Sequence, residues 1–141
     1  GNYNELRYFD GEGWSRDIRQ AKALVPHVST EMSVIPLKEG PWKGKYLANF
    51  EYDSIGKWTC YCVMDTPFGP FGPVCPIYYT PELDRYTQTT YTYNAKAHLH
   101  LSEPSKILVS YNVNDMSMKA NKDDYTIYHP RFLWLTPNST L

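Results

Sequence analysis

The stretch KYLANFEYDSIGKWTCYCVMD, residues 45–65, decides the fold. Within residues 45–53, large apolar side chains recur at every second position, which is the period of a β-strand. The sequence SIG at 54–56 provides a turn, and residues 58–65 are rich in β-branched, aromatic and sulfur-containing side chains. The stretch therefore predicts an antiparallel hairpin. The first strand has an apolar side with Tyr46, Ala48, Phe50 and Tyr52, and a side, polar apart from Leu47, with Lys45, Asn49, Glu51 and Asp53.

Further strands are predicted on both sides of this hairpin. Residues 31–37 form a short strand candidate that ends at a turn over 39–41. The loop TPFGPFGPVCP at 66–76 contains prolines and glycines that prevent regular pairing and require a tight, fixed loop. A fourth strand is predicted at 77–80, so residues 31–80 form one four-stranded meander.

The second half of the chain repeats this plan. Strands are predicted at 92–101, 107–114 and 125–135, and a polar loop is predicted at 115–124. Helical periodicity is scarce, since only residues 18–25 fit a helical turn or two, and they fit a strand nearly as well.

The predicted fold class is all-β, built from antiparallel four-stranded meanders. Radial repetition of such meanders is how a β-propeller protects its strand edges. The chain holds one full meander and three strands of a second, and two blades cannot close a ring. Three alternatives follow: the sequence is a fragment of a larger propeller, several chains come together, or the meanders stack as a sandwich.

Composition excludes two classes of protein and favours amphipathic ligands. The 141 residues carry a net charge of -1, which argues against a nucleic-acid binder that neutralises phosphates. The mean hydropathy of -0.54 predicts no membrane-spanning segment. Aromatic residues make up 16% of the chain and include 13 Tyr, a composition that suits surfaces that grip sugars, although β propensity alone explains it equally well.

The three cysteines do not define a disulfide framework. Cys60 and Cys62 alternate within one predicted strand, so they share a face without being placed to bond each other. Cys75 could pair with either, but three buried thiols are the favoured interpretation. The sequence begins at Gly1 without an export signal, so we expect any signal to have been removed or to lie outside this sequence.

Two blocks of sequence resemble known propellers. TEMSVIPL, GKYLANFEYD and WTCYCVMDTPFGPFGP, within residues 30–73, resemble one blade of the five-bladed β-propeller glycoside hydrolases, the clan of arabinanases, β-xylosidases and fructan-cleaving enzymes. YTYNAKAHLHL, KILVSYNVN and YTIYHPRFLWL, within residues 91–135, are similar to the last blade of a bacterial domain of unknown function grouped with these propellers.

The resemblance implies a fragment of a larger protein. Residues 1–135 would be its carboxy-terminal blades and 136–141 a tail, with 31–37 and 92–101 as innermost strands that line a sugar-binding channel. The catalytic carboxylates of the clan lie on earlier blades, so none is transferred to this sequence. The implied partners are a polysaccharide or oligosaccharide and the remaining blades or another copy of the chain, with neither nucleic acid nor membrane. The implied location is bacterial: secreted, periplasmic or on the cell surface.

The strand over 93–101 provides most of the candidate binding residues. Strict alternation places Tyr93 on one face of this strand. The opposite face carries Asn94, Lys96, His98 and His100, which either meet water or contact a ligand. His98 is the first to test, because an imidazole can donate to a sugar hydroxyl or occupy one metal position. No third metal ligand accompanies the two histidines, so we predict no cofactor, with a channel metal such as calcium as the one alternative.

Three further residues complete the candidate site. Glu31 is the only carboxylate at the start of the other inner strand, where it is either solvated or, if burial raises its pKa, a general acid. Tyr111 is among the aromatic residues that could stack on a sugar ring. Arg131 either pairs with a buried carboxylate or points at an anionic ligand, and the paired role is favoured.

We therefore predict a carbohydrate-active propeller of the glycoside hydrolase type, as a fragment that lacks the full catalytic set. Glycosidic cleavage ordinarily needs two carboxylates, and only Glu31 is assigned, so whether the chain belongs to an enzyme stays open. The alternatives are a non-catalytic glycan-binding propeller or lectin, and a structural β-sandwich or repeat module whose polar row is only solvated.

Overall fold

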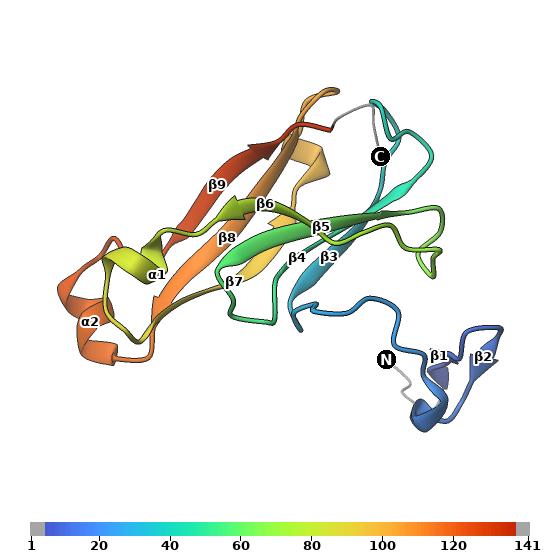
Figure 1. Ribbon diagram of the computed structural model, residues 1–141, viewed down its shortest axis with the longest axis horizontal. Coiled ribbons are helices and arrows are strands. Elements are labelled where there is room, and N and C mark those ends of the chain that lie inside the picture. The colour runs from blue at the N-terminus through green and yellow to red at the C-terminus, as the bar shows by residue number, and fades with distance from the viewer. Residues whose placement is uncertain (1–4, 138–141) are drawn as a thin grey trace.

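A computed structural model describes residues 5–137 of the chain (Figure 1). Its secondary structure is mainly β, with two short α-helices and two single 3₁₀ turns at Ile18–Gln20 and Leu99–Leu101. The strands are β1 Tyr8–Phe9, β2 Trp14–Ser15, β3 Met32–Pro36, β4 Tyr46–Glu51, β5 Trp58–Met64, β6 Cys75–Tyr79, β7 Thr90–Ala97, β8 Ile107–Asp115 and β9 Pro130–Leu135. The helices are α1 Glu82–Arg85 and α2 Met118–Asp123. The predicted all-β class is confirmed.

Every pair of neighbouring strands is antiparallel. The first sheet has the order β3-β4-β5-β6, the second has the order β7-β8-β9, and β1 pairs with β2 in a separate small hairpin. The meander predicted over 31–80 is therefore present. Within the described part of the chain, the sheets do not close into a barrel or a ring.

The two sheets pack against each other, and their contact forms the main core. β7 lies along β3 and β4 of the first sheet, and the backbone N–H of Ala97 donates to Ser33 Oγ at 2.9 Å. Burial of apolar area between the sheets is the main favourable contribution to their association. The buried residues of this layer are Leu37, Trp42, Leu47, Val63, Ala97, Ile107, Val109 and Leu135.

The N-terminal segment and the proline-rich loop cover the other face of the first sheet. Val25, Val28, Phe71 and Val74 pack on a layer that includes Phe50 and both β5 thiols. The β1-β2 hairpin reaches the same loop through ring contacts of Phe9, Trp14 and Phe68. No described helix is long and apolar enough to cross a bilayer.

Three segments differ from the sequence-based expectation. Residues 115–124 include α2, because the Ser117 side chain accepts from the backbone N–H of Ala120 and caps a helix start. The strand expected over 125–135 begins only at Pro130, since Asp124 accepts from the N–H of Thr126 and holds a turn there. The strand expected over 92–101 spans Thr90–Ala97 and then gives way to a 3₁₀ turn.

A β-bulge in β7 changes which side chains share a face. Tyr93 pairs with Asn112 but Lys96 pairs with Ser110, so Asn94 and the next residue together oppose a single position of β8. Asn94 has a left-handed φ of 60°, which Asn tolerates better than most residues. Ser110 and Asn112 are two residues apart and face the same way, so Tyr93 shares its face with Lys96. The prediction that Tyr93 faces away from Lys96 is therefore wrong.

Candidate functional site

A cleft lies on the face of the second sheet that points away from the first sheet. Its volume is about 190 Å³, and β7, β8 and the turn before β9 build it. The side chains that line this Tyr93 cleft are Tyr93, Asn112, Val113, Tyr128, His129 and Pro130. Two phenol rings, an amide and an imidazole thus surround one small cavity, so it offers both apolar ring surface and hydrogen-bonding groups.

The Tyr93 hydroxyl is a group of the cleft whose pKa is shifted. Burial raises the pKa of Tyr93, the neighbouring hydroxyls of Tyr128 and Tyr91 and the carboxylate of Glu31 raise it further, and the Asn114 side chain opposes the rise. Tyr93 therefore stays a neutral phenol that can donate and accept. Glu31, which directly precedes β3, lies within electrostatic range of Tyr93.

Glu31 itself is exposed. Ser29 Oγ donates to its backbone carbonyl at 2.5 Å, so Ser29 fixes the backbone and not the carboxylate. Ser33 Oγ is used as an acceptor by Ala97. The burial on which a general-acid role depends is absent among the residues that the structure describes.

Lys96 and His98 continue the same face beyond Tyr93. His98 Nε2 lies 2.7 Å from Ser110 Oγ, and the His98 ring lies 6.3 Å from the ring of Phe132. Burial, and then the positive charges of His100 and Lys96, lower the pKa of His98, so it is a neutral imidazole at neutral pH. Within residues 5–137, no group of three His, Cys, Asp or Glu side chains could hold a metal ion.

Asn94 does not belong to this row, because the bulge removes it. Its Oδ1 is buried and has no hydrogen-bond partner within the described chain. Left-handed backbone and an unsatisfied buried oxygen both cost stability.

Tyr111 and Arg131 lie on the opposite face of the second sheet, where both bind a carboxylate that the sequence did not single out. The Tyr111 hydroxyl donates to the Glu82 oxygens at 3.1 and 3.2 Å, and Arg131 Nε lies 3.3 Å from Glu82 Oε1. The pKa of Tyr111 is raised mainly by its burial and then by the negative charge of Glu82. Arg131 therefore pairs with a buried carboxylate, which is the role that the sequence analysis favours for it. The six predicted site residues do not form one site.

Another buried carboxylate belongs to Glu51, which lies between the sheets and is 0% exposed. Thr59 Oγ1 donates to one of its oxygens at 3.0 Å and Thr92 Oγ1 to the other at 2.9 Å. Burial raises the pKa of Glu51 to about 7 against the opposing effect of both hydroxyls, and the charge of Glu82 adds to the rise. The β4 face that the sequence presents as polar is therefore buried, because the second sheet covers it.

A count of protons also favours a protonated Glu51. Thr92 Oγ1 contacts Glu51, the Gly56 carbonyl and Thr80 Oγ1, and Thr80 Oγ1 also contacts the Lys57 carbonyl, at 2.9 to 3.1 Å. The two hydroxyls supply only two protons for these four contacts. A protonated carboxyl supplies a third, so one more contact becomes a hydrogen bond.

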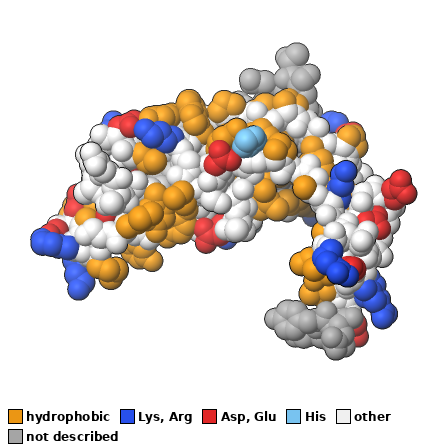
Figure 2. Space-filling view, turned by 60° about the horizontal axis from the view of Figure 1, so that its bottom comes forward, with side chains coloured by type: hydrophobic (Ala, Val, Ile, Leu, Met, Phe, Trp, Pro, Cys, Tyr) orange, Lys and Arg blue, Asp and Glu red, His pale blue; other side chains and the backbone are white. Residues whose placement is uncertain are grey.

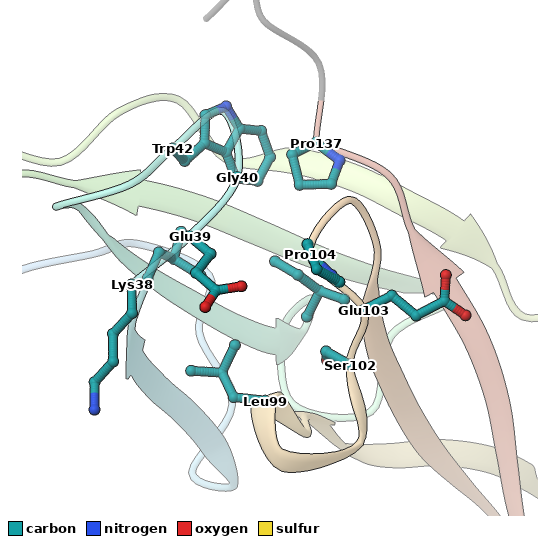
Figure 3. A pocket seen from close by; sticks show the side chains of 11 residues that line it. Lys38, Glu39, Gly40, Trp42, Leu99, Ser102, Glu103, Pro104 and Pro137 are labelled. Atoms are coloured by element: carbon teal, nitrogen blue, oxygen red, sulfur yellow. The ribbon is translucent and has the colours of Figure 1, made fainter.

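A second cavity, of about 240 Å³, lies between the β3-β4 and β7-β8 loops (Figure 3). β3 starts next to Glu31 and ends at this cavity, so the length of β3 separates it from the Tyr93 cleft. The residues that line this loop pocket are Leu37, Lys38, Glu39, Gly40, Trp42, Leu99, Ser102, Glu103, Pro104, Ile107 and Pro137. Sequence analysis singled out none of its carboxylates.

Comparison with known proteins places the fold. No curated protein matches the chain, whereas three solved chains do. One is a crystal structure from Bacteroides ovatus ATCC 8483 described as a "putative hydrolase", with a TM-score of 0.64 and 21% identity. The match covers 85% of this chain but only 32% of that one, so this chain spans about a third of the larger protein's length. A family model matches residues 3–137, and the chain belongs to that family, the domain of unknown function DUF5005.

Proposed function

We propose that this chain is the glycan-binding part of a larger carbohydrate-active, hydrolase-like β-propeller, and that sugar binds in the Tyr93 cleft. The fold match to a longer protein described as a hydrolase supports the hydrolase class. The side-by-side arrangement of β3 and β7, the first strand of each sheet, supports a pair of adjacent blades with these strands innermost.

The observation that carries the proposal is the chemistry of the Tyr93 cleft. A sugar ring presents C–H groups on its faces and hydroxyls at its edge, and aromatic rings flanked by amide and imidazole groups match both. The cavity of about 190 Å³ is smaller than the pockets that enclose drug-sized ligands, so one sugar unit fits it.

A longer glycan has a path out of the cleft along the same sheet face. Phe132 pairs with Ser110 and Trp134 pairs with Leu108, so both rings lie on the side of Ser110 and Asn112. They are 59% and 45% exposed, and the Phe132 ring lies 6.3 Å from the His98 ring. Exposed rings in a row provide stacking surfaces for successive sugar units.

Cleavage requires more than this chain contains. Glycosidases ordinarily place two carboxyl groups on either side of the scissile bond. Glu31 is near the cleft and exposed, so we propose it as the base or nucleophile of the pair, with the general acid on the remaining blades of the larger, exported bacterial protein. If no such partner exists, the chain is part of a lectin.

Binding is tested on a polysaccharide array with the full chain and three variants. Tyr128 lines the cleft and is 63% exposed, so Tyr128→Ala removes a stacking surface without disturbing the core. We expect Tyr128→Ala and Asn112→Ala to weaken binding about tenfold, which corresponds to roughly 1.4 kcal/mol. Tyr125→Ala, which removes an exposed ring outside the cleft, is the control and should bind normally. Unchanged binding in both cleft variants would refute the glycan site.

Catalysis is tested separately in the longer protein. Glu31→Gln should retain binding and abolish turnover if the protein is an enzyme. Normal turnover in this variant would remove Glu31 from the mechanism and leave the binding proposal to the array.

A structural role for the same sheet face is the second candidate. The exposure of Phe132 and Trp134 on a sheet face is also expected where another blade or another copy of the chain packs. In that case both rings would be buried in the longer protein. Trp14→Phe and Trp58→Phe together remove the other exposed tryptophans. Trp134 fluorescence that acrylamide then quenches in the chain but not in the longer protein, together with no glycan binding, would favour this candidate.

A further inference from the structure

We propose that the loop pocket binds an aliphatic ammonium group, and that its natural occupant is a lysine side chain of a polypeptide partner. The pocket lies at the far end of β3 from the Tyr93 cleft (Figure 3). The inference does not depend on the proposed glycan site.

The walls of the pocket are aliphatic. Leu37 and Ile107 are buried members of the core between the sheets, and Leu99 packs against the same core. An alkyl chain that lies on these side chains is removed from water at no cost in unsatisfied polar groups. The pocket therefore favours an extended hydrocarbon arm.

The charge at the pocket selects a cation. Figure 3 shows the Glu39 carboxylate pointing into the cavity, whereas the Lys38 side chain points away from it. Within the described chain, no hydrogen bond or ion pair is made by the Glu39 side chain. The Glu103 carboxylate points away from Glu39 in the same view, so Glu39 is the carboxylate directed into the cavity. An ammonium group that enters beside Glu39 gains a charge-assisted hydrogen bond that a neutral group cannot make.

The geometry disfavours a sugar ring in this pocket. Trp42 is only 4% exposed, and its ring stacks on Tyr61 at a centroid distance of 5.4 Å. Its face is therefore used inside the protein, and no aromatic platform remains for a pyranose. A cavity of about 240 Å³ suits one side chain better than a larger ligand.

The two loops are held in place before a ligand arrives. Gly40 has a φ of 78°, and a Cβ at this position would lie 2.7 Å from the Pro104 carbonyl, so the loops touch here. Ser102 Oγ donates to the His98 carbonyl and accepts from the N–H of Leu108, which fixes the second loop. A preformed pocket loses little conformational freedom when it binds.

The test is a titration of the full chain followed by the shifts of backbone amides in NMR spectra. The probes are n-butylammonium, which reproduces the lysine side chain, and n-butanol, its neutral counterpart. We expect butylammonium to bind about tenfold more tightly, with saturating shifts at Gly40, Ser102 and Leu99, and to weaken as NaCl is raised. Equal binding of the two probes, or shifts elsewhere, would overturn the proposal.

Variants assign the charge effect to one carboxylate. Glu39→Gln should reduce butylammonium binding to the level of butanol, and Glu12→Gln, at an exposed carboxylate in the β1-β2 turn, should leave it unchanged. The spectra themselves report whether each variant is folded. Unchanged affinity in Glu39→Gln would overturn the site.

Two further probes, Nα-acetyl-lysine methylamide and glucose, test the lysine assignment. Nα-acetyl-lysine methylamide should bind at least as tightly as butylammonium, because the pocket is open to the surface and the backbone of a partner can remain outside it. Weaker binding of the lysine derivative, or tighter binding of glucose at the same amides, would show that the occupant is not a lysine side chain.

Discussion

Replacing Glu51 with Gln should remove a pH dependence of stability that a buried acid creates. The pKa of Glu51 rises from its ordinary 4.5 to about 7, mainly because the first and second sheets exclude water from it. At about 1.4 kcal/mol for each tenfold change in proton affinity, this rise corresponds to about 3 kcal/mol.

The sign follows from where the proton is held. In the unfolded chain Glu51 loses its proton near pH 4.5, whereas the folded protein keeps it until about pH 7. Between these values the native state binds more protons, so the free energy of unfolding falls as pH rises and then levels off above pH 7. Gln has a similar shape and is neutral at every pH, so the unfolding free energy of Glu51→Gln should not fall in this way as pH rises.

Urea denaturation of both proteins at pH 5 and pH 8 measures the effect. The difference in unfolding free energy between Glu51→Gln and wild type should shift by about 2 to 3 kcal/mol in favour of the variant from pH 5 to pH 8. Using the difference cancels other titrating groups, including His98, whose lowered pKa acts in the opposite direction. Glu12→Gln, at an exposed carboxylate, is the control and should give no shift. A difference for Glu51→Gln that stays constant over this range would refute the protonated buried acid.

Three further changes follow from the contacts described above. Arg131→Leu leaves Glu82 buried without its cation, so we expect the unfolding free energy measured with urea to fall by about 3 kcal/mol. Arg19→Leu, which breaks an exposed ion pair, should lower it by less than about 1 kcal/mol, and equal losses would contradict the buried pair. Iodoacetamide at pH 8 should label the native protein once, at Cys75. The other two thiols should stay unlabelled, because burial raises the pKa of Cys60 to about 12 and that of Cys62 to about 11. A second label in the mass spectrum would contradict this. Asn94→Gly should stabilise the protein by about 1 kcal/mol and raise its Tm, because Gly adopts a positive φ freely and carries no unsatisfied oxygen; a lower Tm would indicate a partner for that oxygen.

Local sequence signals predicted the first sheet well. The β4-β5 hairpin has alternating apolar residues and a short turn, so periodicity and turn chemistry agree. The sequence contains a signal for the helix α2, since Ser117 precedes good helix formers such as Ala120 and Lys122. The turn before β9 likewise had Asp124 two residues before Thr126.

The candidate site depended on contacts between segments that sequence cannot supply. The alternating pattern of β4 predicts that Glu51 faces solvent, and only the packing of the second sheet buries it beside Thr92. Glu82 lies in a segment with no strand pattern, so its pairing with Arg131 depends on tertiary structure. Asn94 was a sequence signal for the bulge, because Asn is unfavourable within a regular strand and favours a local break in the ladder.

The bulge also determines where this strand can change its length. Tyr93 and Lys96 oppose residues only two positions apart, so β7 contains one residue more than a regular ladder needs. A chain shortened by deletion of Asn94 could pair every remaining residue of β7 without sliding either end. Tyr93 would stay at the cleft and His98 beside Ser110, so a deletion at the bulge preserves the whole exposed face of the strand.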